Sequence, residues 1–128
     1  MNNFKWEVAL LFLPILLLVL ALLFYFNQPK QINFWCGYRT KSSMKNSDTW
    51  TTANKIAARW FLILSSVLVV LLLIIILVLE KASLISIFGS IKTFFFYIIG
   101  TIHIIITASI LIVEYQLNKI FDAIGDRK

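Results

Sequence analysis

Hydrophobic and polar residues lie along this chain in long separate blocks. Three apolar runs cover residues 8–26, 60–79 and 93–113, and polar segments separate and follow them. Each run is close to the roughly 20 residues that a helix needs to cross the ~30 Å hydrocarbon core of a bilayer. Because helices satisfy their own backbone amides in lipid, the pattern predicts an all-α, polytopic membrane protein with three transmembrane helices, in one domain over residues 1–128.

The composition agrees with a lipid environment. Apolar residues make up 60% of the chain and charged residues only 14%, too little charge for the surface of a soluble domain of this length. The first run is longer than the apolar region of a signal peptide and no small-residue cleavage site follows it. We therefore expect a retained span, kinked at Pro14.

Basic residues predict the orientation of the spans. The segment 27–59 carries a large excess of Lys and Arg over its single acid, Asp48, and the tail 114–128 ends in Arg127 and Lys128. The positive-inside bias places both segments in the cytoplasm and the N-terminus outside. Residues 80–92 are too few for two more crossings, so we expect an interfacial helix or a shallow re-entrant hairpin there.

The loop 27–59 contains a helix start. Asn46, Ser47 and Asp48 are all good N-cap residues, and they precede a segment with helical spacing. We predict a helix that begins near Thr49 and continues unbroken into the second span. The tryptophans in this helix, Trp50 and Trp60, are typical of a membrane interface.

The start of the polar motif in this loop offers candidate binding groups. Gly37 indicates a turn or a close approach of the backbone. Arg39, between Tyr38 and Thr40, has five donors for a carboxylate from elsewhere in the fold or for a lipid phosphate. The residue types alone leave both partners open.

The third run contains a polar stripe. At 100° per residue its polar side chains and one glycine fall within an arc of about 120°, and we expect this arc to face the other helices. His103 is either a neutral side chain bonded across a helix interface or a proton-relay or ligand group. Glu114 is expected near Arg39 or Arg59, as a structural brace or part of a ligand site. The stripe consists of Thr93, Tyr97, Gly100, His103, Thr107 and Glu114.

Several function classes find little support. Cys36 is the single cysteine, so no disulfide can form within the chain. No second ligand lies at metal-binding spacing near His103, and we find no cofactor motif, nucleophile–base pair or phosphate loop. Topology explains the basic residues, which argues against nucleic acid as a partner. We therefore expect a non-enzymatic protein without a metal or cofactor.

The segment "GYRTKSSMKNSDTWTTANKIAARW" resembles the signature of the SdpI-type bacterial immunity protein family, and "EYQLNKIFDAIGDRK" resembles that family's ending. The resemblance is to the C-terminal three-span portion of longer members. In the loop the matching residues are Gly37, Tyr38, Arg39, Thr40, Ser43, Met44, Lys45, Asn46, Thr49, Trp50, Ala53 and Asn54. In the tail they are Glu114, Leu117, Phe121, Asp122, Gly125, Arg127 and Lys128.

The resemblance implies a multi-pass protein of the bacterial cell membrane that protects its cell from a membrane-active peptide toxin. It would bind the toxin or the toxin's target, and in some members it would also report the toxin to a repressor held at the membrane. The working site would comprise residues of the motif 37–54, Asp48 among them, together with His103, Thr107 and Glu114. The alternative is a small homo-oligomeric transporter or channel, since three spans are too few to enclose a pore alone.

Overall fold

The computed structural model of the chain describes residues 4–78 and 91–128. These residues form three helices: α1 (Phe4–Phe26), α2 (Ser47–Val78) and α4 (Ile91–Ile120). The described residues form no strand, only an isolated bridge between Phe121 and Arg127, so the all-α prediction is confirmed. The element predicted for residues 80–92 falls outside the described residues, except that 91–92 begin α4.

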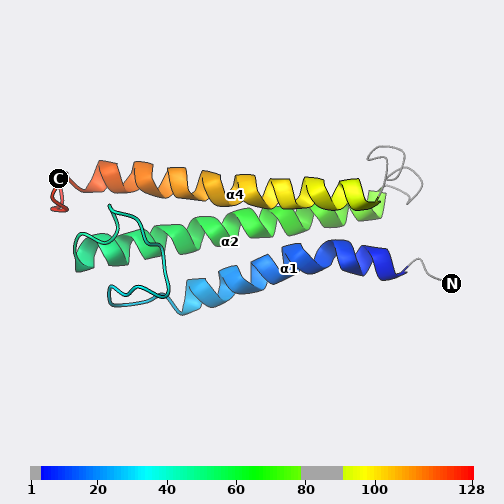
Figure 1. The fold of residues 1–128 in the computed structure, drawn as a ribbon, viewed down its shortest axis with the longest axis horizontal. Helices are drawn as coiled ribbons and strands as arrows, with labels where there is room; N and C mark the ends of the chain where they lie inside the picture. The colour runs from blue at the N-terminus through cyan, green and yellow to red at the C-terminus, as the bar shows by residue number, and fades with distance from the viewer. Residues whose placement is uncertain (1–3, 79–90) are drawn as a thin grey trace.

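The three helices lie side by side, with α2 in the middle (Figure 1). α2 packs against both α1 and α4, and it runs antiparallel to each of them. The loop 27–46 and the C-terminus therefore meet at the same end of the bundle, opposite the N-terminus. We call this the loop end.

Small residues on α2 allow α4 to approach closely near the loop end. Ala53 and Ala57 are buried against Val113 and Leu117 of α4, together with Phe121. Small side chains at such an interface let two helix backbones come near enough for extensive van der Waals contact. A second cluster, formed by Leu68, Leu72 and Ile98, joins the same two helices further along.

The outer surface of the bundle is strongly apolar, with large side chains such as Leu71, Ile74 and Leu111 exposed. By length and composition, two stretches could cross a membrane: Ser47–Val78 and Phe95–Ile120. Within α1, the apolar stretch Leu11–Phe26 is shorter, so the three-span topology stays a prediction. α1 continues through Pro14 as helix, with a curved rather than straight ribbon (Figure 1).

Two helix boundaries refine the sequence interpretation. α2 begins at Ser47 and runs without interruption to Val78, which confirms the predicted continuous helix and moves its start slightly upstream. α4 does not end with the apolar run at residue 113 but continues to Ile120. Glu114 is consequently part of a helix rather than of the tail.

Candidate functional site

Asn46 caps the N-terminus of α2. Its side-chain oxygen accepts hydrogen bonds from the backbone N–H groups of Asp48 and Thr49, at 3.0 and 2.9 Å. The Thr49 hydroxyl oxygen in turn accepts the Asn46 N–H at 3.0 Å. This reciprocal arrangement is a capping box with threonine in the usual Glu or Gln position, and it identifies Asn46, rather than Asp48, as the N-cap.

A compact turn precedes the cap. The Thr40 N–H donates to Ser43 Oγ at 2.9 Å, and the Ser43 N–H donates to Thr40 Oγ1 at 3.2 Å. The Ser43 hydroxyl donates to the Tyr38 carbonyl at 2.8 Å. Ser43 is fully buried. Thr40 and Ser43 therefore serve mainly to hold the backbone of the turn.

A second set of contacts joins the loop to the side of α2. The buried Asn54 accepts the Tyr38 N–H at 2.7 Å and donates to the Trp50 carbonyl at 2.9 Å. The indole N–H of Trp50 donates to the Pro29 carbonyl at 2.9 Å. Trp50 is completely buried, so the prediction that it lies at a membrane interface is wrong. Its ring instead fills the space between α2 and the returning chain.

Gly37 fits closely into this joint. Its φ of +108° lies in a region that side chains disfavour. A Cβ placed there would lie 2.7 Å from Asn54 Oδ1 and 2.8 Å from Pro29 Cγ. The turn expected at Gly37 is confirmed, and its cause is both the backbone conformation and the lack of space.

The loop is fastened to α4 through Glu114. The Tyr38 hydroxyl donates to Glu114 Oε1 at 3.0 Å, and the Ser42 hydroxyl donates to Oε2 at 2.8 Å. Burial, followed by the hydrogen bond to Glu114 and its negative charge, raises the pKa of Tyr38, so the phenol stays protonated as a donor. The predicted pairing of Glu114 with Arg39 or Arg59 is wrong: the only salt bridge among the described residues joins Arg127 to Asp48.

The C-terminal segment closes over the cap of α2. Asn46 donates to the Gly125 carbonyl at 2.8 Å, and Gly125 has a φ of +106°. Arg127 donates two hydrogen bonds to the carboxylate of Asp48, at 2.7 and 2.8 Å, in a bidentate salt bridge. Backbone N–H groups, chiefly those of Asp126 and Gly125, lower the pKa of the Asp122 carboxylate that accepts them. Loop, cap and tail thus form one hydrogen-bonded assembly.

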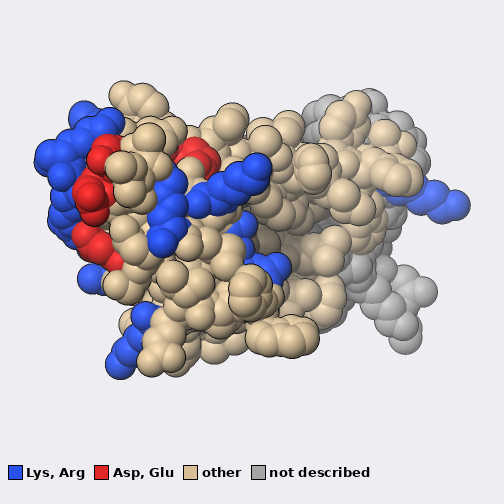
Figure 2. All heavy atoms as spheres, turned by 60° about the vertical axis from the view of Figure 1, so that its left-hand side comes forward, with Lys and Arg blue, Asp and Glu red and all other residues tan. Residues whose placement is uncertain are grey.

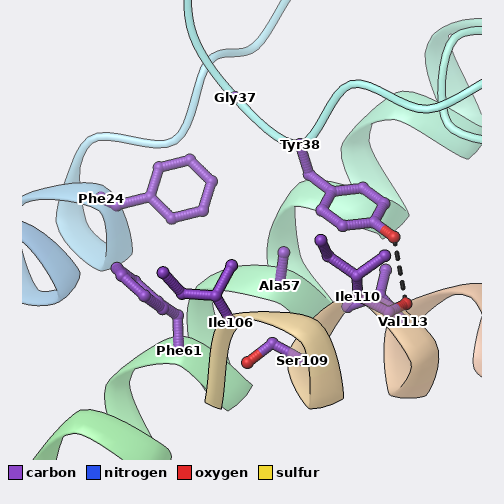
Figure 3. Close-up of a pocket in the computed structure, with 9 residues that line it drawn as sticks. All are labelled: Phe24, Gly37, Tyr38, Ala57, Phe61, Ile106, Ser109, Ile110 and Val113. Atoms are coloured by element: carbon purple, nitrogen blue, oxygen red, sulfur yellow. Dashed lines mark hydrogen bonds between the residues drawn. The ribbon is translucent and has the colours of Figure 1, made fainter. Parts of the chain in front are cut away.

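A cavity of about 270 Å³ lies beneath the turn at Gly37 and Tyr38. Figure 3 shows its lining side chains converging from three helices and the loop, with the dashed line marking the contact of the Tyr38 hydroxyl with the Ile110 carbonyl. The walls are mostly apolar, including Phe24 of α1 and Phe61 of α2. The one polar helix side chain, Ser109, donates to its own helix at the Ile105 carbonyl.

Lys and Arg side chains gather at the loop end, while most of the remaining surface in this view is uncharged (Figure 2). Arg39, Lys55 and Arg59 are all exposed. Of the predicted binding groups, Arg39 therefore remains accessible, whereas Trp50 and Asn54 do not. Free Cys36 is also exposed.

The polar stripe of α4 faces outward, contrary to the prediction. Tyr97, Gly100, His103 and Thr107 are exposed, and nothing lies within 4 Å of a Cβ built at Gly100. The Thr107 hydroxyl donates to the His103 carbonyl of the same helix at 3.0 Å. The face of α4 that packs on α2 is instead lined by side chains that include Ile98, Ser109, Val113 and Leu117. Only Glu114 joins the loop motif, so the structure separates His103 and Thr107 from it.

Sequence reasoning missed two participants. Ser42 contacts Glu114 directly, and its position beside Ser43 was the only available hint. Pro29 contributes a carbonyl, which no side-chain pattern reveals. Among the described residues, no three His, Cys, Asp or Glu side chains group closely enough to hold a metal ion.

Long apolar helices with an apolar outer surface, closed at one end by a hydrogen-bonded polar cap, define a small helical membrane protein. The capped segment also carries the family signature. Residues 30–114 match the model of the SdpI/YfhL protein family, so the chain belongs to that family. No curated protein and no solved structure shows significant similarity to the chain.

Proposed function

We propose that this chain is a non-enzymatic immunity protein of the bacterial cell membrane that protects its cell against a membrane-active peptide toxin. It acts by binding the toxin or the toxin's target, and it relays the toxin's presence to a cytoplasmic repressor held at the membrane. Membership of the SdpI/YfhL family supports the immunity class. The assignment of a toxin and of a repressor is our extension of it.

The proposed topology has three spans, with the N-terminus outside and the loop end in the cytoplasm. Two observations support it. The Lys and Arg side chains gather at the loop end (Figure 2), where the positive-inside rule expects them. The apolar run 8–26 has the length and composition of a membrane span. The apolar helical stretch found within α1, Leu11–Phe26, is shorter than this run.

The observation that carries the proposal is the attachment of the loop motif to α4. Tyr38 and Ser42 of the loop donate hydrogen bonds to Glu114, and Tyr38 also lines the apolar cavity. The cavity is apolar apart from the hydroxyls of Tyr38 and Ser109, and the exposed Arg39 follows Tyr38 directly in the chain. This combination suits an amphipathic peptide, whose apolar side chains and polar backbone need both environments. Toxin recognition is therefore proposed at the cavity, Glu114 and the exposed Arg39.

A toxin challenge of sensitive cells tests this proposal. Cells that express the wild type should survive, and Tyr38→Phe should reduce survival, because the hydrogen bond to the charged Glu114 contributes about 1.5–3 kcal/mol and its loss shifts the docking equilibrium of the loop at least about tenfold. Tyr115→Phe is the matched control, since Tyr115 is 70% exposed and follows Glu114 directly. Equal killing with and without the wild-type protein, at confirmed membrane expression, would refute the immunity function for that toxin.

The outward stripe of α4 favours a second candidate, a homo-oligomeric transporter or channel. His103 and Thr107 face away from their own bundle, where polar groups in lipid would be satisfied by another copy. Proton flux into liposomes that contain the protein, lost in His103→Ala, would support this function. Absence of flux with the wild type would exclude it.

A further inference from the structure

A second cavity, of about 340 Å³, lies at the loop end between the end of α1 and the first turns of α2. Phe26, Pro29 and Lys30 line it from one side, and Thr51 and Lys55 line it from α2. It is distinct from the apolar cavity beneath Tyr38 and shares no lining residue with it. Its two lysines make it a candidate site for an anion.

The positive charge in this cavity is not neutralised by a salt bridge. No Asp or Glu lines it, and the single salt bridge in the described part of the chain, Arg127 to Asp48, involves neither lysine. Asp48 is an acid that interacts electrostatically with Lys55, but its carboxylate already forms a salt bridge with Arg127. Lys30 and Lys55 are both exposed, so their ammonium groups can reach a ligand.

The cavity also lies at the depth of lipid headgroups in the proposed topology. Phe26 ends the first apolar run, and Trp60 begins the second. At 1.5 Å per residue, Lys55 stands about 7.5 Å beyond Trp60 along α2. This distance matches a headgroup layer of roughly 5–8 Å on each side of the hydrocarbon core.

Exposed aromatic side chains in the cavity lining and in the loop that follows fit the same environment. Phe26 is 75% exposed on its rim, and Phe34 and Trp35 in the following loop are 76% and 94% exposed. Rings in such positions are costly in water and typical of a membrane interface. A soluble anion would leave them exposed, whereas a lipid would cover Phe26 with its acyl chains.

We propose that this cavity binds the phosphate of an anionic phospholipid headgroup between Lys30 and Lys55, with the lipid's acyl chains lying along Phe26. The Gln28 amide, which uses one N–H for the Tyr25 carbonyl, has its second N–H available for the headgroup. The ligand class follows from the paired cations, the missing acid and the depth. The inference requires the membrane location but not the toxin function.

Binding of phosphatidylglycerol to the full chain in neutral detergent micelles, followed by native mass spectrometry, tests the site. In Lys30→Gln/Lys55→Gln we expect an affinity about 25-fold lower, from the roughly fivefold that each basic residue contributes near an anionic surface. The matched control, Lys41→Gln/Lys119→Gln, removes two exposed cations outside the cavity and should change affinity less than threefold. Lys30→Arg/Lys55→Arg keeps both charges and should retain binding, which separates charge from folding.

Three outcomes would overturn the proposal. Equal losses in the cavity pair and the control pair would indicate diffuse surface charge. Equal affinity for phosphatidylcholine, whose headgroup is neutral overall, would remove the argument from charge. Competition by inorganic phosphate at the same concentration as the lipid would identify a site for free anions. Because the readout is lipid binding, failure here leaves the immunity proposal untouched, and a failed toxin challenge leaves the lipid site untouched.

Discussion

Replacement of Gly37 by alanine should detach the loop from α2. The added Cβ would lie 2.7 Å from Asn54 Oδ1, 2.8 Å from Pro29 Cγ and 3.1 Å from Trp50 Cη2. Pro29 is a rigid ring and Trp50 is completely buried, so neither can move aside easily. The φ of +108° adds strain that the glycine does not have.

The magnitude follows from three contributions. A positive φ costs a residue with a side chain about 1–2 kcal/mol, and overpacking costs about 1–3 kcal/mol. If Asn54 withdraws, the Tyr38 N–H loses its acceptor at a cost of about 1–3 kcal/mol. Because relaxation lowers one cost while it raises another, we expect a net loss of about 3 kcal/mol in the stability of the docked loop.

Amide hydrogen exchange in micelles measures this loss directly. A change of about 3 kcal/mol in local opening corresponds to roughly 150-fold faster exchange at Tyr38 and Thr40, whose N–H groups are hydrogen-bonded in the docked loop. Gly100→Ala is the control, because its Cβ would meet nothing within 4 Å. Exchange at Tyr38 and Thr40 that changes less than threefold in Gly37→Ala would refute the steric argument.

Three further predictions concern the contact of the loop with Asn54, the salt bridge of Asp48 and the tail. Asn54→Ala should lower the free energy of unfolding by about 1–3 kcal/mol, since it removes the acceptor of the partly buried Tyr38 N–H; a loss below about 0.5 kcal/mol in a mixed-micelle titration would contradict this. Asp48→Asn should leave the melting temperature unchanged within about 1 °C, because its ion pair is exposed, and a salt-dependent fall of several degrees would show otherwise. The pKa of Asp122 is lowered on folding, so its contribution is present above the unfolded pKa of about 3.9 and is lost as pH falls through the lower folded value. The amide NMR shifts of Ile124 and Gly125, whose N–H groups donate to Asp122, should follow that titration and lose this dependence in Asp122→Asn.

Much of the fold could be predicted because its determinants are local. An apolar run of sufficient length must become helix in lipid, whatever surrounds it. The helix start near Asn46 is also local, since the Asn46 side-chain oxygen and the two backbone N–H groups that donate to it lie within three residues. The turn at Gly37 could likewise be predicted from residue type, although its closest neighbours, Asn54 and Pro29, could not.

The candidate site was only partly predictable, because its partners come from distant segments. Glu114 was correctly expected to tie the last helix to the loop, but through Arg39 or Arg59. The contacts that form are those of Tyr38 and Ser42, since the close approach of the loop brings short hydroxyl side chains to the carboxylate. Two of the predicted site residues, Trp50 and Asn54, are buried and hold the loop in place.

The sequence by itself determined the helical class, the position of the apolar runs and the short segment, residues 46–48, in which α2 is capped, because hydropathy and capping act over a few neighbouring residues. Only the tertiary structure decided which face of α4 turns inward. In lipid, hydrophobicity does not distinguish one apolar helix face from another, so close van der Waals packing makes the choice. Val113 and Leu117 fit against the small Ala53 and Ala57 of α2, and this fit leaves His103 on the outer surface.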